Sequence, residues 1–160
     1  CFDIVFAFEI IEHLLIPENL VNEAHRVLKP SGYLVLSTNN LRWWLHIILL
    51  MLGYQPYVPD TGYYRNYGTF SRDLPSAGHI RAYTRRALEE LLSDFTFLKV
   101  IGIPHPYRVS VAWKHFLKLL DRLFCKIPSL AYDLVVIAAK SPETNGRVSS
   151  SFGIPLAHQR

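Results

Sequence analysis

The feature that most constrains this 160-residue chain is the order strand, helix, strand within residues 2–38. Residues 2–8 form a nearly continuous apolar run with β-branched and aromatic side chains, which is typical of a strand buried on both faces. Residues 17–28 then place apolar side chains at helical spacing, and residues 33–38 form a second apolar run. Two strands joined by a helix make a βαβ unit with parallel strands. The sequence therefore predicts an α/β fold built on a parallel sheet.

The regular alternation stops at residues 41–78. This stretch begins with a short apolar helix candidate, residues 41–52, and continues as a Gly-, Pro- and Tyr-rich segment without a clear period. We interpret it as an insertion or lid. The alternation returns afterwards, and the further predicted elements are a helix that begins after Thr84, a strand at 97–103, an amphipathic basic helix at 111–126 and a strand at 132–140. Residues 141–160 have no period and are predicted to be a disordered tail.

Charge, cysteine usage and hydropathy exclude several classes. The two cysteines, Cys1 and Cys125, lie far apart and match no metal or redox spacing, so a reducing, cytoplasmic setting fits the chain. The net charge of +4 is scattered and does not require an anionic partner. No signal peptide is recognisable, and the apolar run at 45–52 is too short to span a bilayer. We expect a soluble or peripherally membrane-bound protein.

Three motifs near the beginning of the chain carry a resemblance to a known family. They are Phe2-Asp3-Ile4-Val5, Glu12-His13-Leu14 and Arg26-Val27-Leu28-Lys29-Pro30-Ser31-Gly32-Tyr33-Leu34. In order and spacing they resemble the fourth strand, the following helix and the fifth strand of class I S-adenosylmethionine-dependent methyltransferases of the type 11/23 kind. His79 to Thr84, the Leu-rich helix after them and the closing strand that ends at Lys140 are more weakly similar to the family's later elements.

The resemblance implies a partial Rossmann-like methyltransferase sheet. Residues 1–140 would be the C-terminal half of the domain, with strands 4 to 7 of a seven-stranded sheet, the last strand antiparallel, helices on both faces, and 41–78 as an inserted helical and aromatic lid. Strand 4 would leave an unpaired apolar edge. The family's Gly-rich loop and the acidic residue that hold the cofactor have no counterpart here. We therefore expect the 160-residue chain alone to bind S-adenosylmethionine poorly.

The turn after the first strand is the predicted site of chemistry. Ligands of open parallel sheets bind beyond the carboxyl ends of the strands, so Ala7, Phe8 and Glu9 are candidate cofactor contacts. If residues 9–13 form a helical turn, then Glu9, Glu12 and His13 share one face. Such a group could bind a divalent ion, or His13 could act as a general base with Glu12 beside it.

A second resemblance concerns the same turn. The segment Glu-Ile-Ile-Glu-His at 9–13 is similar to ubiquinone-biosynthesis O-methyltransferases and to small-RNA 2′-O-methyltransferases, which carry Glu-x-x-Glu-His and a later His. Here the later residue would be His79, which makes it the third catalytic candidate. The implied metal site is Glu9, Glu12, His13 and His79. The alternative is structural, because a Glu-His pair can orient the turn and hydrogen-bond the backbone without any metal.

Aromatic residues concentrate between Trp43 and Tyr83, with arginines interleaved. Aromatic side chains provide large contact areas with polar tips, as an acceptor pocket needs. The candidate acceptor contacts are Trp43, Trp44, Tyr63, Tyr64 and Arg81. We expect a small-molecule or lipid-like acceptor. RNA is the runner-up, because stacking aromatics with arginines also suit RNA, but no basic run or recognition motif supports a nucleic acid.

Two predicted apolar helices could contact either a membrane or the core of the protein itself. The stripe at 41–52, headed by Trp43-Trp44, and the amphipathic helix near Trp113 either lie in a membrane interface or pack on the domain.

The predicted function is methyl transfer to an oxygen or nitrogen of the acceptor. The alternatives are a non-catalytic binding or membrane-docking module on the same fold, an RNA 2′-O-methyltransferase, and half of a nucleotide-dependent dehydrogenase, although the chain has no dinucleotide fingerprint. The sequence alone identifies neither the acceptor nor the oligomeric state.

Overall fold

The structure, a computed structural model, describes residues 1–106 and 114–141. Its elements along the chain are β1 (Phe2–Phe8), the 3-10 turn η1 (Ile11–His13), α1 (Pro17–Val27), β2 (Leu28–Asn39), α2 (Trp44–Met51), α3 (Arg85–Leu91), β3 (Phe95–Ile103), α4 (Lys114–Phe124), the 3-10 turn η2 (Pro128–Leu130) and β4 (Asp133–Lys140). The predicted tail from 142 onward, and the part of the predicted basic helix around Trp113, lie outside the described residues.

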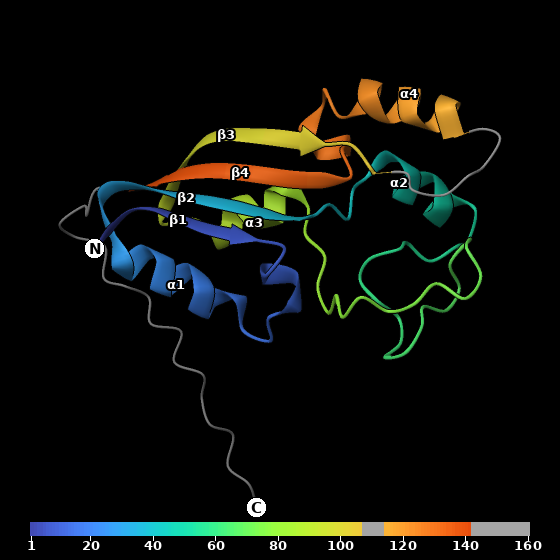
Figure 1. Ribbon diagram of the computed structural model, residues 1–160, viewed down its shortest axis with the longest axis horizontal. Helices are drawn as coiled ribbons and strands as arrows, with labels where there is room; N and C mark the ends of the chain where they lie inside the picture. The colour runs from blue at the N-terminus through green and yellow to red at the C-terminus, as the bar shows by residue number, and fades with distance from the viewer. Residues whose placement is uncertain (107–113, 142–160) are drawn as a thin grey trace, which may run out of the picture.

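The four strands form one open sheet with the order β1-β2-β4-β3 (Figure 1). β1 pairs with β2 in parallel, whereas β4 is antiparallel to both of its neighbours. The α/β class and the antiparallel last strand are therefore confirmed. The carboxyl ends of β1 and β2 and the beginning of β4 consequently meet at one edge of the sheet.

β1 is not buried on both faces, so that part of the prediction is wrong. Phe2, Ile4, Phe6 and Phe8 are exposed, whereas the alternate position Ala7 is buried. The physical reason is position: among the described residues β1 pairs only with β2, and of its side chains only Val5 and Ala7 pack in the main core. The expected unpaired apolar edge is confirmed.

The main core lies between the sheet and the helices α1 and α3. It contains apolar side chains that alternate along β2 and β4 and others that recur at helical spacing; among them are Leu34, Leu36, Leu134, Val136, Val21, Ala24 and Leu88. Local signals define both helices. Pro17 occupies the first turn of α1, and the Thr84 hydroxyl accepts a hydrogen bond from the Ala87 N–H at the beginning of α3, at 3.2 Å.

A second, smaller core lies where α2 and α4 meet. It is centred on Trp43 and Trp44, against which Leu117, Leu120 and Phe124 of α4 pack. Figure 1 shows the two helices side by side at one end of the molecule, with the loop of residues 53–78 below them. No helix in the described part of the chain is long and apolar enough to cross a membrane.

Candidate functional site

Polar side chains from three strands meet at the sheet edge where β1 and β2 end. Asn39, the last residue of β2, donates through Nδ2 to Asp133 Oδ1 at 2.8 Å and to Glu9 Oε2 at 3.3 Å. Ser37 Oγ donates to Glu9 Oε1 at 2.5 Å. The parallel pairing of β1 with β2 and the reversed direction of β4 bring these groups together. The edge therefore carries two carboxyl groups, Glu9 and Asp133, that are bridged by the Asn39 amide.

The turn that follows β1 differs from the predicted helical turn over residues 9–13. Glu9 has a φ of 49°, in the left-handed region, and only Ile11–His13 form a 3-10 turn. Glu9 therefore lies outside the 3-10 turn that carries Glu12 and His13, and the spacing rule for a shared face, which applies only within one helix, does not apply to it. Its carboxylate is held by Ser37 and Asn39 instead.

Glu12 is completely buried. One carboxylate oxygen, Oε2, accepts a hydrogen bond from Thr38 Oγ1 at 3.0 Å, whereas Oε1 is buried and accepts none from any residue that the structure describes. Burial raises the pKa of this carboxyl above its ordinary value, and the charge of Glu9 raises it further. A buried acid with a spare oxygen is unusual in a folded protein and marks a candidate functional group.

His13 and His79 lie beside Glu12. Their rings are 4.9 Å apart, and one ligand atom from each of the three residues falls within 4.8 Å of the others. His13 Nδ1 donates to the Gly78 carbonyl at 2.8 Å, because a carbonyl can only accept. Burial lowers the pKa of the His79 imidazole, which favours its neutral form. The structure thus brings together three of the four predicted metal ligands and places Glu9 outside the group.

Asp60 positions the segment that carries His79, and sequence reasoning missed it. Asp60 Oδ2 accepts hydrogen bonds from the backbone N–H groups of Ala77 and His79 and from Ser76 Oγ, and Oδ1 accepts one from Asn66, all at 2.7 to 2.9 Å. The Asp60 N–H in turn donates to the His79 carbonyl at 2.8 Å. No local sequence motif predicts this arrangement, because Asp60 lies within residues 53–78, where the apolar residues follow no periodic pattern.

Arg81 has a role different from the predicted acceptor contact. Its guanidinium donates to the carbonyls of Leu14 and Leu15 at 3.0 and 2.6 Å. The backbone N–H groups of Ile80 and Arg81 both donate to the Glu12 carbonyl. Arg81 therefore ties the segment of His79 to the turn of Glu12.

Asp133 is a second functional candidate that sequence reasoning missed. Burial raises the pKa of its carboxyl to about 7, the charges of Glu9 and Glu12 act in the same direction, and the hydrogen bond from Asn39 opposes them. The sequence could have predicted this role. An antiparallel last strand begins at the edge of the sheet where the parallel strands end, so its first polar residue, Asp133, lies at that edge.

The remaining predicted site residues are not gathered into one pocket. Trp43 and Trp44 are only 1% and 6% exposed, and both indole N–H groups donate to Asp121 Oδ1, so neither presents a surface to an acceptor. This part of the prediction is wrong, because the two indoles form the second core. Tyr63 and Tyr64 are almost fully exposed in the loop of residues 53–78.

The predicted cofactor contacts differ in exposure. The Ala7 side chain faces the main core, and Phe8 is half-exposed at the sheet edge. Beside η1 lies an open, mostly apolar groove of about 850 Å³, lined among others by Ile10, Leu14, Ile16 and Leu20. Ile10 and Leu14 flank η1, so the groove borders the turn that carries Glu12 and His13.

The chain matches one family model and is similar to several solved structures. Residues 1–100 match the family model described as a methyltransferase domain. Among solved structures, the chain is similar to a SAM-dependent methyltransferase of Thermotoga maritima described as a possible histamine N-methyltransferase, with 16% identity, a TM-score of 0.53, and coverage of 88% of this chain and 56% of that one. It is also similar to a SAM-dependent methyltransferase of Methanosarcina mazei, with 18% identity, a TM-score of 0.50, and coverage of 89% and 60%.

The chain covers only part of the solved structures that it matches. The chain spans little more than half of the length of both solved structures. No curated protein is similar enough in sequence to match it. At these identities the structural likeness establishes the fold, and the family match disfavours the dehydrogenase alternative.

Proposed function

Because this chain belongs to the methyltransferase domain family, we propose that the intact protein transfers a methyl group from S-adenosylmethionine to an oxygen or nitrogen of a small-molecule or lipid-like acceptor. The observation that carries the proposal is the cluster of Glu12, His13 and His79 beyond the carboxyl end of β1. This is the edge at which open α/β sheets bind their ligands.

The sheet edge suits a cationic cofactor. S-adenosylmethionine supplies an electrophilic methyl group on a positively charged sulfonium. The half-exposed ring of Phe8 and the carboxylate of Glu9 would contact it, and Asp133 adds negative charge nearby when it is ionised. Ser37 and Asn39 hold the Glu9 carboxylate in place, so its position does not depend on the cofactor.

His13 is the proposed general base. Because Nδ1–H is donated to the Gly78 carbonyl, Nε2 is the ring nitrogen that can accept a proton. When the acceptor oxygen or nitrogen takes the methyl group that the sulfonium would supply, His13 Nε2 would accept the proton that the acceptor loses. Burial lowers the pKa of the His79 imidazole, which disfavours a positive charge beside His13. The apolar groove beside η1 supports an apolar acceptor.

The test uses the intact protein and S-adenosylmethionine labelled in its methyl group. The label is followed into a lipid extract, a pool of polar small molecules and total RNA from the same cells. We expect label in one of the first two fractions, and about 100-fold less with His13→Ala. His115→Ala, an exposed histidine on α4, is the matched control and should retain full activity. Label in RNA alone would overturn the acceptor class, and full activity of His13→Ala would overturn the base.

Two outcomes separate the remaining alternatives. An intact protein that binds S-adenosylmethionine in calorimetry but labels no fraction, or that does not bind it at all, supports the non-catalytic module. For the 160-residue chain alone we propose weak cofactor binding, and low-micromolar binding by this chain would contradict that.

A divalent metal is the second candidate for the same cluster. Glu12, His13 and His79 would hold it, and the spare, buried Glu12 Oε1 supports this choice. One carboxylate and two imidazoles suit Zn²⁺, Fe²⁺ or Mn²⁺, which could polarise an acceptor hydroxyl. The test is the metal content of the purified intact protein by mass spectrometry. Glu12→Gln should lower it and Glu90→Gln, on the surface of α3, should not; equal content in all three proteins would contradict a metal site.

A further inference from the structure

Helix α4 has more apolar surface than its own core uses. Leu117, Leu120 and Phe124 pack against Trp43 and Trp44. A second apolar set points away from that core; each of its members, Phe116, Leu119, Leu123 and the following Ile127, is more than half exposed. A soluble helix normally has one apolar stripe, so a second one needs an explanation.

Basic side chains border this outward stripe. At about 100° per residue, Phe116, Leu119 and Leu123 lie between the core-facing side of α4 and a side that carries Lys118 and Arg122. Lys126 extends the basic side beyond the last turn and is also exposed. In the part of the chain that the structure describes, none of these three cations forms an ion pair.

The only acidic residue of α4 does not offset this charge at the surface. Asp121 is 2% exposed, and its carboxylate accepts hydrogen bonds from both indole N–H groups and from the backbone N–H of His105. The outward surface of α4 is therefore apolar and cationic, with no exposed carboxylate.

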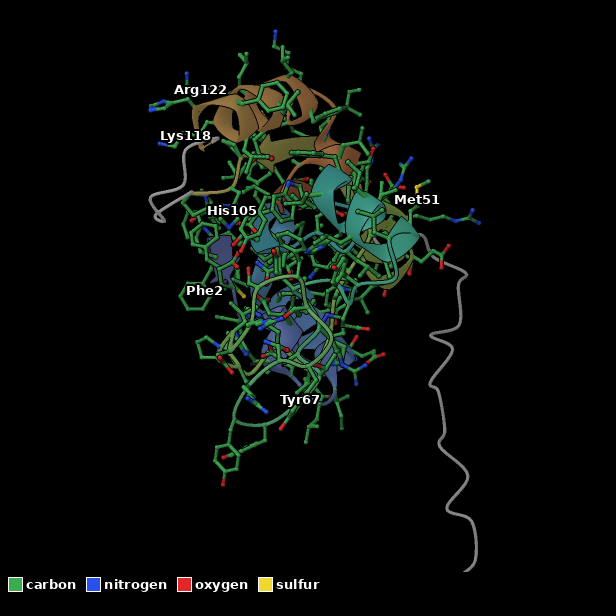
Figure 2. The ribbon with its side chains drawn as sticks, turned by 90° about the vertical axis from the view of Figure 1, so that its right-hand side faces the viewer. Phe2, Met51, Tyr67, His105, Lys118 and Arg122 are labelled. Atoms are coloured by element: carbon green, nitrogen blue, oxygen red, sulfur yellow. The ribbon has the colours of Figure 1, made fainter. Side chains whose placement is uncertain are left out.

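The position of α4 leaves this surface accessible. Both views place α4 at the periphery of the molecule, beyond β3 and away from β1 (Figures 1 and 2). β1 and β3 are the two edge strands of the sheet, so a further strand paired with β1 would lie on the side of the sheet away from β3 and α4. Figure 2 also shows Lys118 and Arg122 on the same side of α4, above His105. Together with Pro104, Pro106 and Asp121, whose carboxylate accepts three hydrogen bonds from the protein, these three residues line a hollow of about 460 Å³, large enough for a phosphate group.

We propose that α4 is a membrane-docking helix that lies flat on an anionic lipid bilayer. Phe116, Leu119 and Leu123 enter the interface between headgroups and acyl chains, while Lys118 and Arg122 contact lipid phosphates. The combination of an apolar stripe with flanking cations and no free acid matches such a surface. This inference concerns a face separate from the site of His13 and holds whether or not the protein is an enzyme.

The test is co-sedimentation of the intact protein with vesicles of phosphatidylcholine alone or mixed with phosphatidylglycerol. We expect binding to the mixed vesicles, much weaker binding to the neutral ones, and a loss of binding at high salt because ions screen the headgroups. The double variant Lys118→Glu/Arg122→Glu should weaken binding at least about thirtyfold, because it removes two cations and adds two carboxylates. The triple variant Phe116→Ser/Leu119→Ser/Leu123→Ser should weaken it at least about tenfold.

Matched controls come from the same chain. Ile48→Ser/Met51→Ser/Leu52→Ser removes exposed apolar groups at the end of α2, and Arg72→Glu/Lys99→Glu reverses two exposed charges elsewhere. Both should bind as the wild type does. All variants change exposed residues, and circular dichroism checks their folding. No binding to anionic vesicles, equal loss in the controls, or an α4 variant that changes the oligomeric state and leaves vesicle binding intact would overturn the proposal.

Discussion

The imidazole rings of His13 and His79 lie 4.9 Å apart, although one follows β1 and the other precedes α3. Two contacts produce this approach. His13 Nδ1 bonds the Gly78 carbonyl, and Gly78, with a φ of +83°, brings its backbone close to the histidine ring. Asp60 then holds the backbone of His79 from the other side.

Replacement of Asp60 should therefore disturb both stability and site. Asp60→Ala removes the acceptor of four hydrogen bonds, and we expect a loss of about 2–3 kcal/mol in the free energy of unfolding. Any activity or metal content that depends on His79 should fall as well. Urea unfolding and the labelling assay measure the two effects. Asp73→Asn breaks only a surface pair with Arg65 and should change neither quantity.

Asp133 should make stability depend on pH. Burial raises the pKa of this carboxyl to about 7 from an ordinary value of 3.8. Between about pH 4 and pH 7 the folded chain keeps a proton that the unfolded chain has released, so its contribution to stability falls as the pH rises.

Asp133→Asn should remove this fall. We expect the variant to be more stable than the wild type at pH 8, by about 1–3 kcal/mol, and about equally stable at pH 4. Thermal unfolding across this range measures the effect. Asp94→Asn, an exposed aspartate, should follow the wild-type curve. A pH profile of Asp133→Asn that parallels the wild type would refute the raised pKa.

Asp121 should be essential to the second core. Asp121→Ala leaves the indole N–H groups of Trp43 and Trp44 and the N–H of His105 without their carboxylate acceptor. We expect a loss of about 2–4 kcal/mol and a red-shifted tryptophan fluorescence, because water reaches the indoles. Arg122→Ala, the exposed neighbour, should leave fluorescence and unfolding midpoint nearly unchanged.

Gly102 should tolerate no side chain. A Cβ there would lie 2.5 Å from the Cβ of Ala131 and 2.7 Å from the Cys125 carbonyl oxygen, closer than atoms can pack. Gly102→Ala should cost about 1–3 kcal/mol through overpacking. Gly53→Ala is the comparison: its Cβ meets open space, so only the strain of a φ of +83° applies, about 1–2 kcal/mol. Equal unfolding midpoints for the two variants would contradict the steric account.

Several features follow from the chain itself. The apolar runs at 2–8 and 33–38 and the helical spacing at 17–28 determine a βαβ unit, because local pattern and element length suffice to identify strands and helices. Pro17 and Thr84 mark helix beginnings for the same local reason. The placement of the site at the end of the first strand also came from the sequence, since it depends only on strand direction.

The family resemblance already implied that His79 lies beside His13, but tertiary structure alone decided how the site is supported. The hydrogen bonds of Asp60 and the raised pKa of Asp133 depend on contacts between segments far apart in the chain, which no local period encodes. Burial also depended on the tertiary structure. The exposed residues of β1 contradicted the expected burial on both faces, and the burial of Trp43 and Trp44 showed that this pair packs on the domain and does not line an acceptor pocket. Exposure depends on which neighbouring elements cover a side chain and not on its own hydrophobicity.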